Sequence, residues 1–178
     1  MRRNIVLIGM MGAGKTAIGT DLSRKLHLPF VDTDAEIERA ATMSITEIFA
    51  RDGEAFFRAR ESEVLTRVLS GPPCIVSTGG GAWIQPHNRN AIRERGISVW
   101  LTADLETLWH RVKLRPTRPL LQTADPHGTL AKLLAERTPI YAEADITVFA
   151  QRNDTIDETS NRVIEAIRAK YPEALEKK

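Results

Sequence analysis

Short apolar runs alternate along the chain with longer segments in which apolar residues recur every three or four positions. The short runs predict β-strands, and their nearly continuous apolar character is typical of strands that are covered on both faces. They are Asn4–Ile8, Phe30–Asp32, Cys74–Thr78, Ser98–Leu101 and Ile146–Phe149. The longer segments predict helices at Ala17–Leu26, Asp34–Ala41, Ser44–Asp52, Gly53–Leu69, Asn88–Arg95, Asp104–Leu114, Gly128–Ala142 and Thr155–Lys170. This alternation predicts an α/β fold in which helices cover both faces of a parallel sheet.

Two segments interrupt the alternation. Between Thr33 and Leu69 two or three helices precede the next strand, and Ser44-Ile-Thr-Glu47 has the pattern of a capping box that starts one of them. Between Arg115 and Pro126 neither period is present. Loops beyond the carboxyl ends of parallel strands form the ligand crevice in such folds. We therefore expect a single domain over residues 1–178, with a substrate-binding insertion at about 33–61 and a lid at about 112–125.

Composition narrows the class of protein only modestly. A length of 178 residues is enough for one domain with its own core, and a net charge of +2 gives no support for binding nucleic acid or an anionic membrane. No apolar run approaches the roughly 20 residues of a membrane span. The single cysteine, Cys74, lies in an apolar run and has no internal disulfide partner, which fits a reducing compartment. We expect a cytoplasmic protein in which this thiol is buried.

The segment Gly9-Met-Met-Gly-Ala-Gly-Lys-Thr16 carries the clearest chemical signal. It follows a predicted strand, precedes a predicted helix and matches G-x-x-x-x-G-K-[ST], the P-loop. Its glycines let successive backbone N–H groups point at an anion, and the positive end of the next helix strengthens that site. Lys15 can reach the β- and γ-phosphates of a nucleotide, and the Thr16 hydroxyl can bind Mg²⁺. A glycine-rich turn that precedes Lys-Thr by chance is the alternative.

Asp32 and Asp34 come at the end of the second predicted strand, one strand away from the P-loop. Two carboxylates at this spacing on a strand project to the same side. One could complete the Mg²⁺ shell, often through water, while the other contacts a substrate hydroxyl. The structural alternative is that Asp34 caps a helix that begins at Ala35.

Three consecutive glycines, 79–81, directly follow the third strand and give a bare backbone that a ligand can approach closely. Arg58, Arg118 and Arg137 are less distinctive, because a helix arginine is usually solvated. Arg58 could simply pair with Glu61 three residues later. Arg118 lies in the aperiodic segment, where a cation could neutralise the charge that builds on a transferred γ-phosphoryl group.

Taken together, these motifs resemble the shikimate kinase family over about Asn4 to Arg168. Besides the P-loop, the resemblance rests on Asp-Thr-Asp (32–34), Gly53-Glu-Ala-Phe-Phe-Arg58, Thr78-Gly-Gly-Gly81, Arg118-Pro-Leu-Leu121 and Glu136-Arg-Thr-Pro-Ile-Tyr141. It implies a three-layer P-loop NTPase fold with a five-stranded parallel sheet in the order 2-3-1-4-5. It also implies a monomer that phosphorylates the 3-hydroxyl of shikimate with MgATP, in the aromatic amino acid pathway.

The resemblance also implies roles for individual residues. Lys15, Asp34 and Arg118 would be catalytic, and Thr16 and Asp32 would hold Mg²⁺. The nucleotide would contact Gly12, Ala13, Gly14, Lys15, Thr16, Ala17, Arg111, Arg118 and Arg152. Shikimate would contact Asp34, Phe49, Phe57, Arg58, Gly79, Gly80, Gly81 and Arg137, with the two arginines on its carboxylate. One departure is the loop Ala150-Gln-Arg-Asn-Asp154, which lacks the proline usual in the family and leaves the role of Arg152 open.

Two other functions remain possible from the residues alone. Another small-molecule kinase of this fold, acting on gluconate or a nucleoside monophosphate, would share the P-loop. The Arg58 and Arg137 pair favours an acceptor that carries a carboxylate. A nucleotide-binding regulator without catalysis is the other alternative, and the presence of Lys15 and Thr16 with both aspartates argues against it.

Overall fold

The structure, a computed structural model, describes residues 3–115 and 119–176. Five strands are separated by helices, in the order that the apolar pattern predicts. The strands are β1 (Asn4–Ile8), β2 (Phe30–Asp32), β3 (Ile75–Ser77), β4 (Gly96–Thr102) and β5 (Ile146–Phe149). The helices are α1 (Lys15–Leu26), α2 (Thr33–Ala41), α3 (Ile45–Leu69), α4 (Pro86–Arg95), α5 (Leu105–Val112), α6 (Pro126–Tyr141) and α7 (Ile156–Lys170). Short 3₁₀ turns lie at Ala82–Ile84, Pro119–Leu121 and Pro172–Ala174.

The five strands form one parallel sheet in the order β2-β3-β1-β4-β5, which confirms the predicted topology. In the central pairs Ile5 lies opposite Ile75 and Ile97, and Leu7 lies opposite Ser77 and Val99. All five residues of β1 are buried, as expected for a strand with helices on both faces. The P-loop follows this central strand and is therefore anchored in the most buried part of the sheet.

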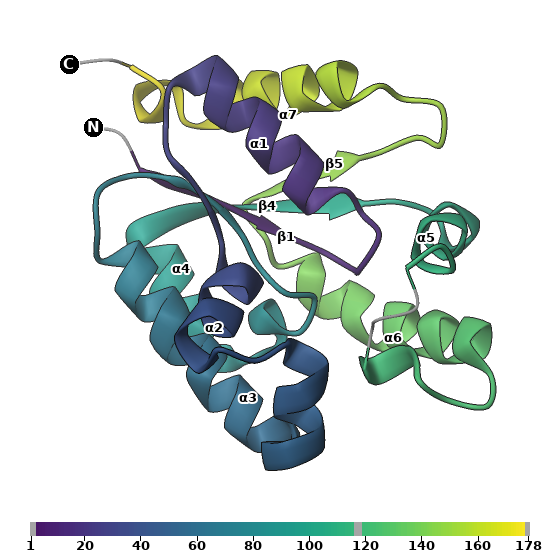
Figure 1. Ribbon diagram of the computed structural model, residues 1–178. Helices are drawn as coiled ribbons and strands as arrows, with labels where there is room; N and C mark the ends of the chain where they lie inside the picture. The colour runs from purple at the N-terminus through teal and green to yellow at the C-terminus, as the bar shows by residue number, and fades with distance from the viewer. Residues whose placement is uncertain (1–2, 116–118, 177–178) are drawn as a thin grey trace.

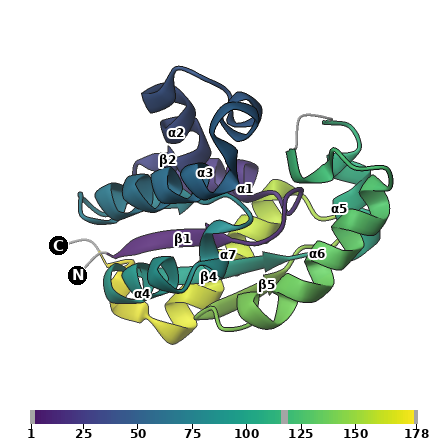
Figure 2. The same cartoon turned by 90° about the horizontal axis from the view of Figure 1, so that it is seen from below.

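Helices α1 and α7 cover one face of the sheet, and α3, α4 and α6 cover the other (Figures 1 and 2). The pair α2 and the first half of α3 projects away from the sheet, and a small second core of Ile37, Ile48, Phe57 and Val64 fills the space between them. Cys74 is buried, as expected. This projecting part of the chain therefore has apolar packing of its own.

The two helices predicted at 44–52 and 53–69 run together as α3, with a break at Gly53 (φ 84°, ψ 171°). Ser44 caps its first turn and forms the predicted capping box with Glu47. Helix α2 begins at Thr33, before the predicted start, and its N-cap is Asp32 rather than Asp34. In the segment predicted to be aperiodic, Pro119–Leu121 forms a 3₁₀ turn. Within the described residues, no helix combines the length and apolarity needed to span a membrane.

Candidate active site

The P-loop has the backbone that its glycines predict. Gly9, Gly12 and Gly14 have φ values of 141°, 83° and 94°, a region that favours glycine. A Cβ on Gly9 would lie 2.5 Å from the Leu101 carbonyl oxygen, so the first glycine also allows a close approach to β4. The Ala13 N–H donates to the Met10 carbonyl at 3.1 Å, closing the turn. Helix α1 then begins at Lys15 without a side-chain cap, which leaves its positive end open to an anion.

Lys15 folds back over the loop that it ends. Its Nζ donates to the carbonyl oxygens of Gly9 at 2.8 Å and Met10 at 2.9 Å, and the residue is buried. An ammonium buried in this way needs such partners, because an unpaired charge in the interior is very costly. The ammonium is therefore held at the anion cradle, with its charge balanced by carbonyl dipoles.

Asp32 and Thr16 come together, whereas Asp32 and Asp34 do not share a side of a strand as the spacing predicted. Thr16 Oγ1 lies 3.4 Å from Asp32 Oδ2. The other oxygen, Oδ1, accepts hydrogen bonds from the N–H groups of Asp34 (2.9 Å) and Ala35 (3.2 Å). The prediction of a shared side was wrong because the strand ends at Asp32 and Asp34 lies in the first turn of α2. A hydroxyl beside a carboxylate is a donor pair that suits Mg²⁺, so these two residues fit the metal.

Asp34 faces the triple-glycine loop instead. A Cβ on Gly79 would lie 2.9 Å from Asp34 Oδ1 and 3.0 Å from Glu61 Oε2, so the two carboxylates meet over this glycine. Glu61 has no exposed surface. Burial raises the pKa of Glu61, opposed by Arg58, while the Asp34 charge raises it further and Arg137 lowers it. The sequence suggested Glu61 only as a surface partner of Arg58, and its burial makes it part of the site.

Arg58 and Arg137 lie against the same triple-glycine loop. A Cβ on Gly81 would lie 2.5 Å from Arg58 Nη2, and one on Gly80 would lie 3.1 Å from Arg137 Nη1. Arg58 pairs with Glu61 at 2.9 Å. Arg137 is buried on α6, and its Nη1 has no hydrogen-bond partner within the described chain. Two guanidiniums beside bare backbone form a site that suits a carboxylate, which both could bind through paired hydrogen bonds.

The two aromatic residues implied by the resemblance are neighbours. The ring centroids of Phe49 and Phe57 are 4.9 Å apart with a 46° tilt, one from each side of the break at Gly53. The Arg58 guanidinium lies 5.2 Å from the Phe57 ring centroid. An apolar wall therefore adjoins the cationic part of the site.

The other residues expected to contact the nucleotide lie in different parts of the structure. Arg111 on α5 donates to the Gly12 carbonyl at 3.0 Å and so lies directly on the P-loop. Ala17 is exposed in the first turn of α1. Arg152 is exposed in the loop after β5, and its charge helps to lower the pKa of Asp104, after the hydrogen bonds from Thr107. Arg118 lies outside the described residues.

Tyr141, the last residue of α6, is a site residue for which sequence reasoning gave no role. It has no exposed surface, and its hydroxyl donates to the Gly80 carbonyl and lies 3.8 Å from Met10 Sδ. The sequence placed it at the end of the motif Glu136-Arg-Thr-Pro-Ile-Tyr141, four residues after Arg137, which puts both side chains on one face of the helix.

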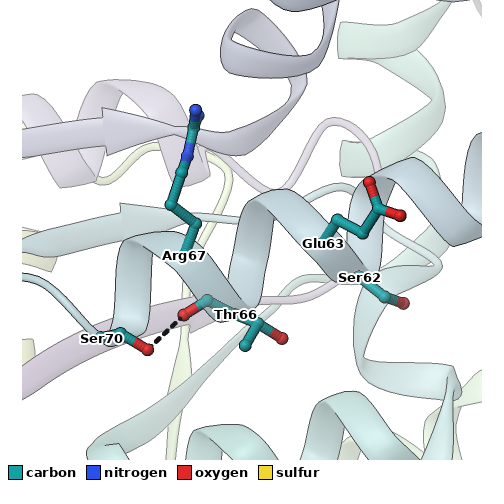
Figure 3. Close-up of a pocket in the computed structure, with 5 residues that line it drawn as sticks. All are labelled: Ser62, Glu63, Thr66, Arg67 and Ser70. Carbon is teal, nitrogen blue, oxygen red and sulfur yellow. Dashed lines mark hydrogen bonds between the residues drawn. The ribbon is translucent and has the colours of Figure 1, made fainter.

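Two depressions on the surface lie elsewhere on α3. One, of about 460 Å³, is lined by Ser62, Glu63, Thr66, Arg67 and Ser70 (Figure 3). The other, of about 400 Å³, lies between α2 and α3, and its arginines pair with neighbouring carboxylates: Arg51 with Asp52, Arg60 with Glu63, and Arg67 with Glu36. Neither lining includes a P-loop residue, Asp34, Arg58 or Arg137.

A phosphate cradle on the central strand, with a cationic acceptor site across the triple-glycine loop, defines a P-loop kinase. Comparison with known proteins gives the family. A family model described as shikimate kinase matches residues 11–168. The shikimate kinase of Cereibacter sphaeroides is 54% identical over 176 residues, which cover 99% of this chain and 87% of that one. The chain therefore belongs to the shikimate kinase family and is an enzyme, a kinase.

Other relatives agree. The shikimate kinase of Ruegeria pomeroyi is 55% identical over 167 residues, 94% of this chain and 86% of that one. The solved structure of shikimate kinase from Acinetobacter baumannii in complex with shikimate superposes with a TM-score of 0.91 at 37% identity, covering 96% of each chain. A gluconokinase from Sinorhizobium meliloti, at 17% identity and a TM-score of 0.60 over 95% of this chain and 94% of its own, shares the fold.

Proposed function

We propose that this chain transfers the γ-phosphoryl group of MgATP to the 3-hydroxyl of shikimate, giving shikimate 3-phosphate and ADP. The observation that carries the proposal is the pair Arg58 and Arg137, whose guanidiniums lie against Gly81 and Gly80, next to Asp34 against Gly79. A carboxylate bound by two guanidiniums and a ring hydroxyl bound by a carboxylate match a hydroxylated cyclic acid.

The acceptor is held by three kinds of group in this proposal. Arg58 and Arg137 bind its carboxylate, and Asp34 accepts hydrogen bonds from ring hydroxyls beside Gly79. Phe49 and Phe57 wall the ring on the side of the insertion. The buried Nη1 of Arg137 then gains the acceptor that it lacks in the protein alone, which favours binding because an unsatisfied buried donor is costly.

The phosphate groups lie in the P-loop, with the backbone of residues 12–17 around them and Arg111 beside the loop. Thr16 and Asp32 would hold Mg²⁺ beside the phosphates, where the metal would help to neutralise the negative charge on the transferred group. Lys15 leaves the Gly9 and Met10 carbonyls to contact the β- and γ-phosphates. Arg118, from the segment between α5 and α6, contacts the phosphates as well, and Arg152 is assigned to the adenine edge.

The chemistry is an in-line transfer without a covalent enzyme intermediate. Because the transition state is loose, positioning and charge stabilisation contribute more than base catalysis. Asp34 accepts the proton of the attacking hydroxyl late in the transfer. The insertion at 33–61 and the lid at 112–125 close over both ligands, which excludes water and limits hydrolysis of ATP.

ATP consumption with shikimate, gluconate or AMP as acceptor tests the substrate. We expect Mg²⁺-dependent ATP consumption with shikimate as acceptor and none with gluconate or AMP. Turnover with a different acceptor only would overturn the substrate assignment, and nucleotide binding without turnover on any acceptor would favour a regulator.

The variant Arg58→Ala tests the carboxylate site, with Arg60→Ala as its matched control, because Arg60 lies on the same helix and pairs with Glu63 on the exposed side. Losing a charged hydrogen bond should raise the shikimate KM by about 10-fold or more. The ATP KM should stay nearly constant, and the control should resemble the wild type. An unchanged shikimate KM in Arg58→Ala would contradict the carboxylate assignment.

A further inference from the structure

Tyr141 joins three parts of the site that are far apart in sequence. Its hydroxyl donates to the Gly80 carbonyl, 61 residues away, and lies 3.8 Å from Sδ of Met10 in the P-loop. Its ring stacks on Trp100 of β4, with centroids 5.8 Å apart and an interplanar angle of 28°. Arg137 stands one helical turn earlier on α6. A buried tyrosine normally needs a partner for its hydroxyl, and here that partner is backbone of the substrate loop.

The Gly80 carbonyl belongs to the Gly80–Gly81 peptide unit, which both arginines approach. A Cβ on Gly80 would approach Arg137 Nη1 at 3.1 Å, and one on Gly81 would approach Arg58 at 2.5 Å, so each of the two residues that form this peptide unit has a guanidinium close to it. The backbone here is three glycines, which have more conformational freedom than any other residue. A hydrogen bond that fixes the carbonyl also fixes the plane of the whole peptide unit, because that unit is planar.

We propose that Tyr141 is a positioning residue for the acceptor site: its hydroxyl holds the Gly80–Gly81 peptide in the orientation that spaces Arg58 and Arg137 for one carboxylate. This inference rests on the proposed function of that site. The anchoring at α6 is rigid, since the Ile140 carbonyl accepts a hydrogen bond from Trp83 Nε1 at 2.8 Å. Burial raises the pKa of Tyr141, against the opposing influence of Arg137, so the hydroxyl keeps its proton for the Gly80 carbonyl in the neutral range.

The experiment is Tyr141→Phe, which removes the hydroxyl and keeps the ring on Trp100. The sequence provides a matched control, because it contains only two tyrosines. Tyr171 also donates its hydroxyl, to Asp145 at 3.2 Å, but outside the site. We expect Tyr141→Phe to raise the shikimate KM about 10-fold, with an ATP KM within about twofold of wild type, and Tyr171→Phe to leave both unchanged. A purely structural role would lower the unfolding temperature without changing the shikimate KM, and that result would overturn the proposal.

A second measurement covers the case in which Tyr141→Phe does not fold. In the Tyr171→Phe background, 3-fluorotyrosine labels Tyr141 alone and keeps its hydroxyl. Adding shikimate should shift the ¹⁹F resonance, and adding gluconate should not. If the ¹⁹F resonance does not shift when shikimate is added, in a protein that turns shikimate over, the positioning role is overturned. Absence of shikimate turnover in the wild type would instead contradict the proposed function, so the two failures are distinguishable.

Discussion

Arg58 Nη1 lies 2.9 Å from Oε1 of Glu61, a carboxylate with no exposed surface. The two residues are one turn apart on α3, so the helix itself sets their spacing. Glu61 Oε2 faces Gly79, beside Asp34. The pair therefore connects a residue assigned to the acceptor carboxylate with the loop assigned to its hydroxyls.

Glu61→Gln should weaken acceptor binding more than turnover. The amide keeps the shape of the side chain but removes the charge that orients the Arg58 guanidinium. We expect the shikimate KM to rise by about 10-fold, in line with the loss of one charged hydrogen bond. Steady-state kinetics with each substrate varied in turn measures this. Glu63→Gln is the control, because Glu63 pairs with Arg60 in solvent on the same helix, and a KM in Glu61→Gln that matches this control would contradict the prediction.

Glu61 should also leave a signature in the pH dependence of stability. Its pKa is raised in the folded protein, chiefly by burial, so the folded state binds the proton more tightly than the unfolded state. Stability from this group is therefore fully present below the unfolded pKa and is lost as the pH rises through the folded pKa. The difference in free energy of unfolding between wild type and Glu61→Gln, measured with urea at a series of pH values, should decrease over that window. A difference in free energy of unfolding that stays constant with pH would refute this predicted pH dependence.

Lys15→Ala should lower turnover about 100-fold or more, as expected when a donor to developing charge is removed. In the structure the ammonium is already held at the cradle by the Gly9 and Met10 carbonyls. The kinetic measurement is kcat at saturating ATP and shikimate, with Lys132→Ala, at an exposed position of α6, as control. Normal turnover in Lys15→Ala would exclude the proposed mechanism.

Gly53→Ala should destabilise the protein, although alanine is the better helix former. Gly53 has φ 84° and ψ 171°, a conformation that is nearly restricted to glycine, and nothing lies within 4 Å of a Cβ placed there. The cost is therefore conformational, about 1–3 kcal/mol of unfolding free energy. Denaturant titration measures it. Gly71→Ala, where φ is not positive and the nearest atom is 3.4 Å away, should be close to neutral. Equal effects in the two variants would contradict this account.

The sequence predicted the order of the elements and the P-loop well, because both depend on local patterns. The prediction that Asp32 and Asp34 share a side of a strand was wrong for a physical reason: a strand of three residues is too short for its period to show where it ends, and Asp32 starts the helix by capping it. The Arg58 and Glu61 spacing is the same in a solvated ion pair and in a buried one. Only packing across the fold makes Glu61 part of the site. The contact of Tyr141 with Gly80 joins residues 61 positions apart and has no local signal.

The hydrogen bonds of Lys15 bear on how nucleotide affinity should be understood. The ammonium donates to two carbonyls of its own loop, so an arriving phosphate replaces these carbonyls as its acceptor. Binding at this position is an exchange of one acceptor for another. The contribution of Lys15 to nucleotide affinity is therefore the strength of its bond to an anionic phosphate less that of the two carbonyl bonds given up, and is smaller than the phosphate bond alone would suggest.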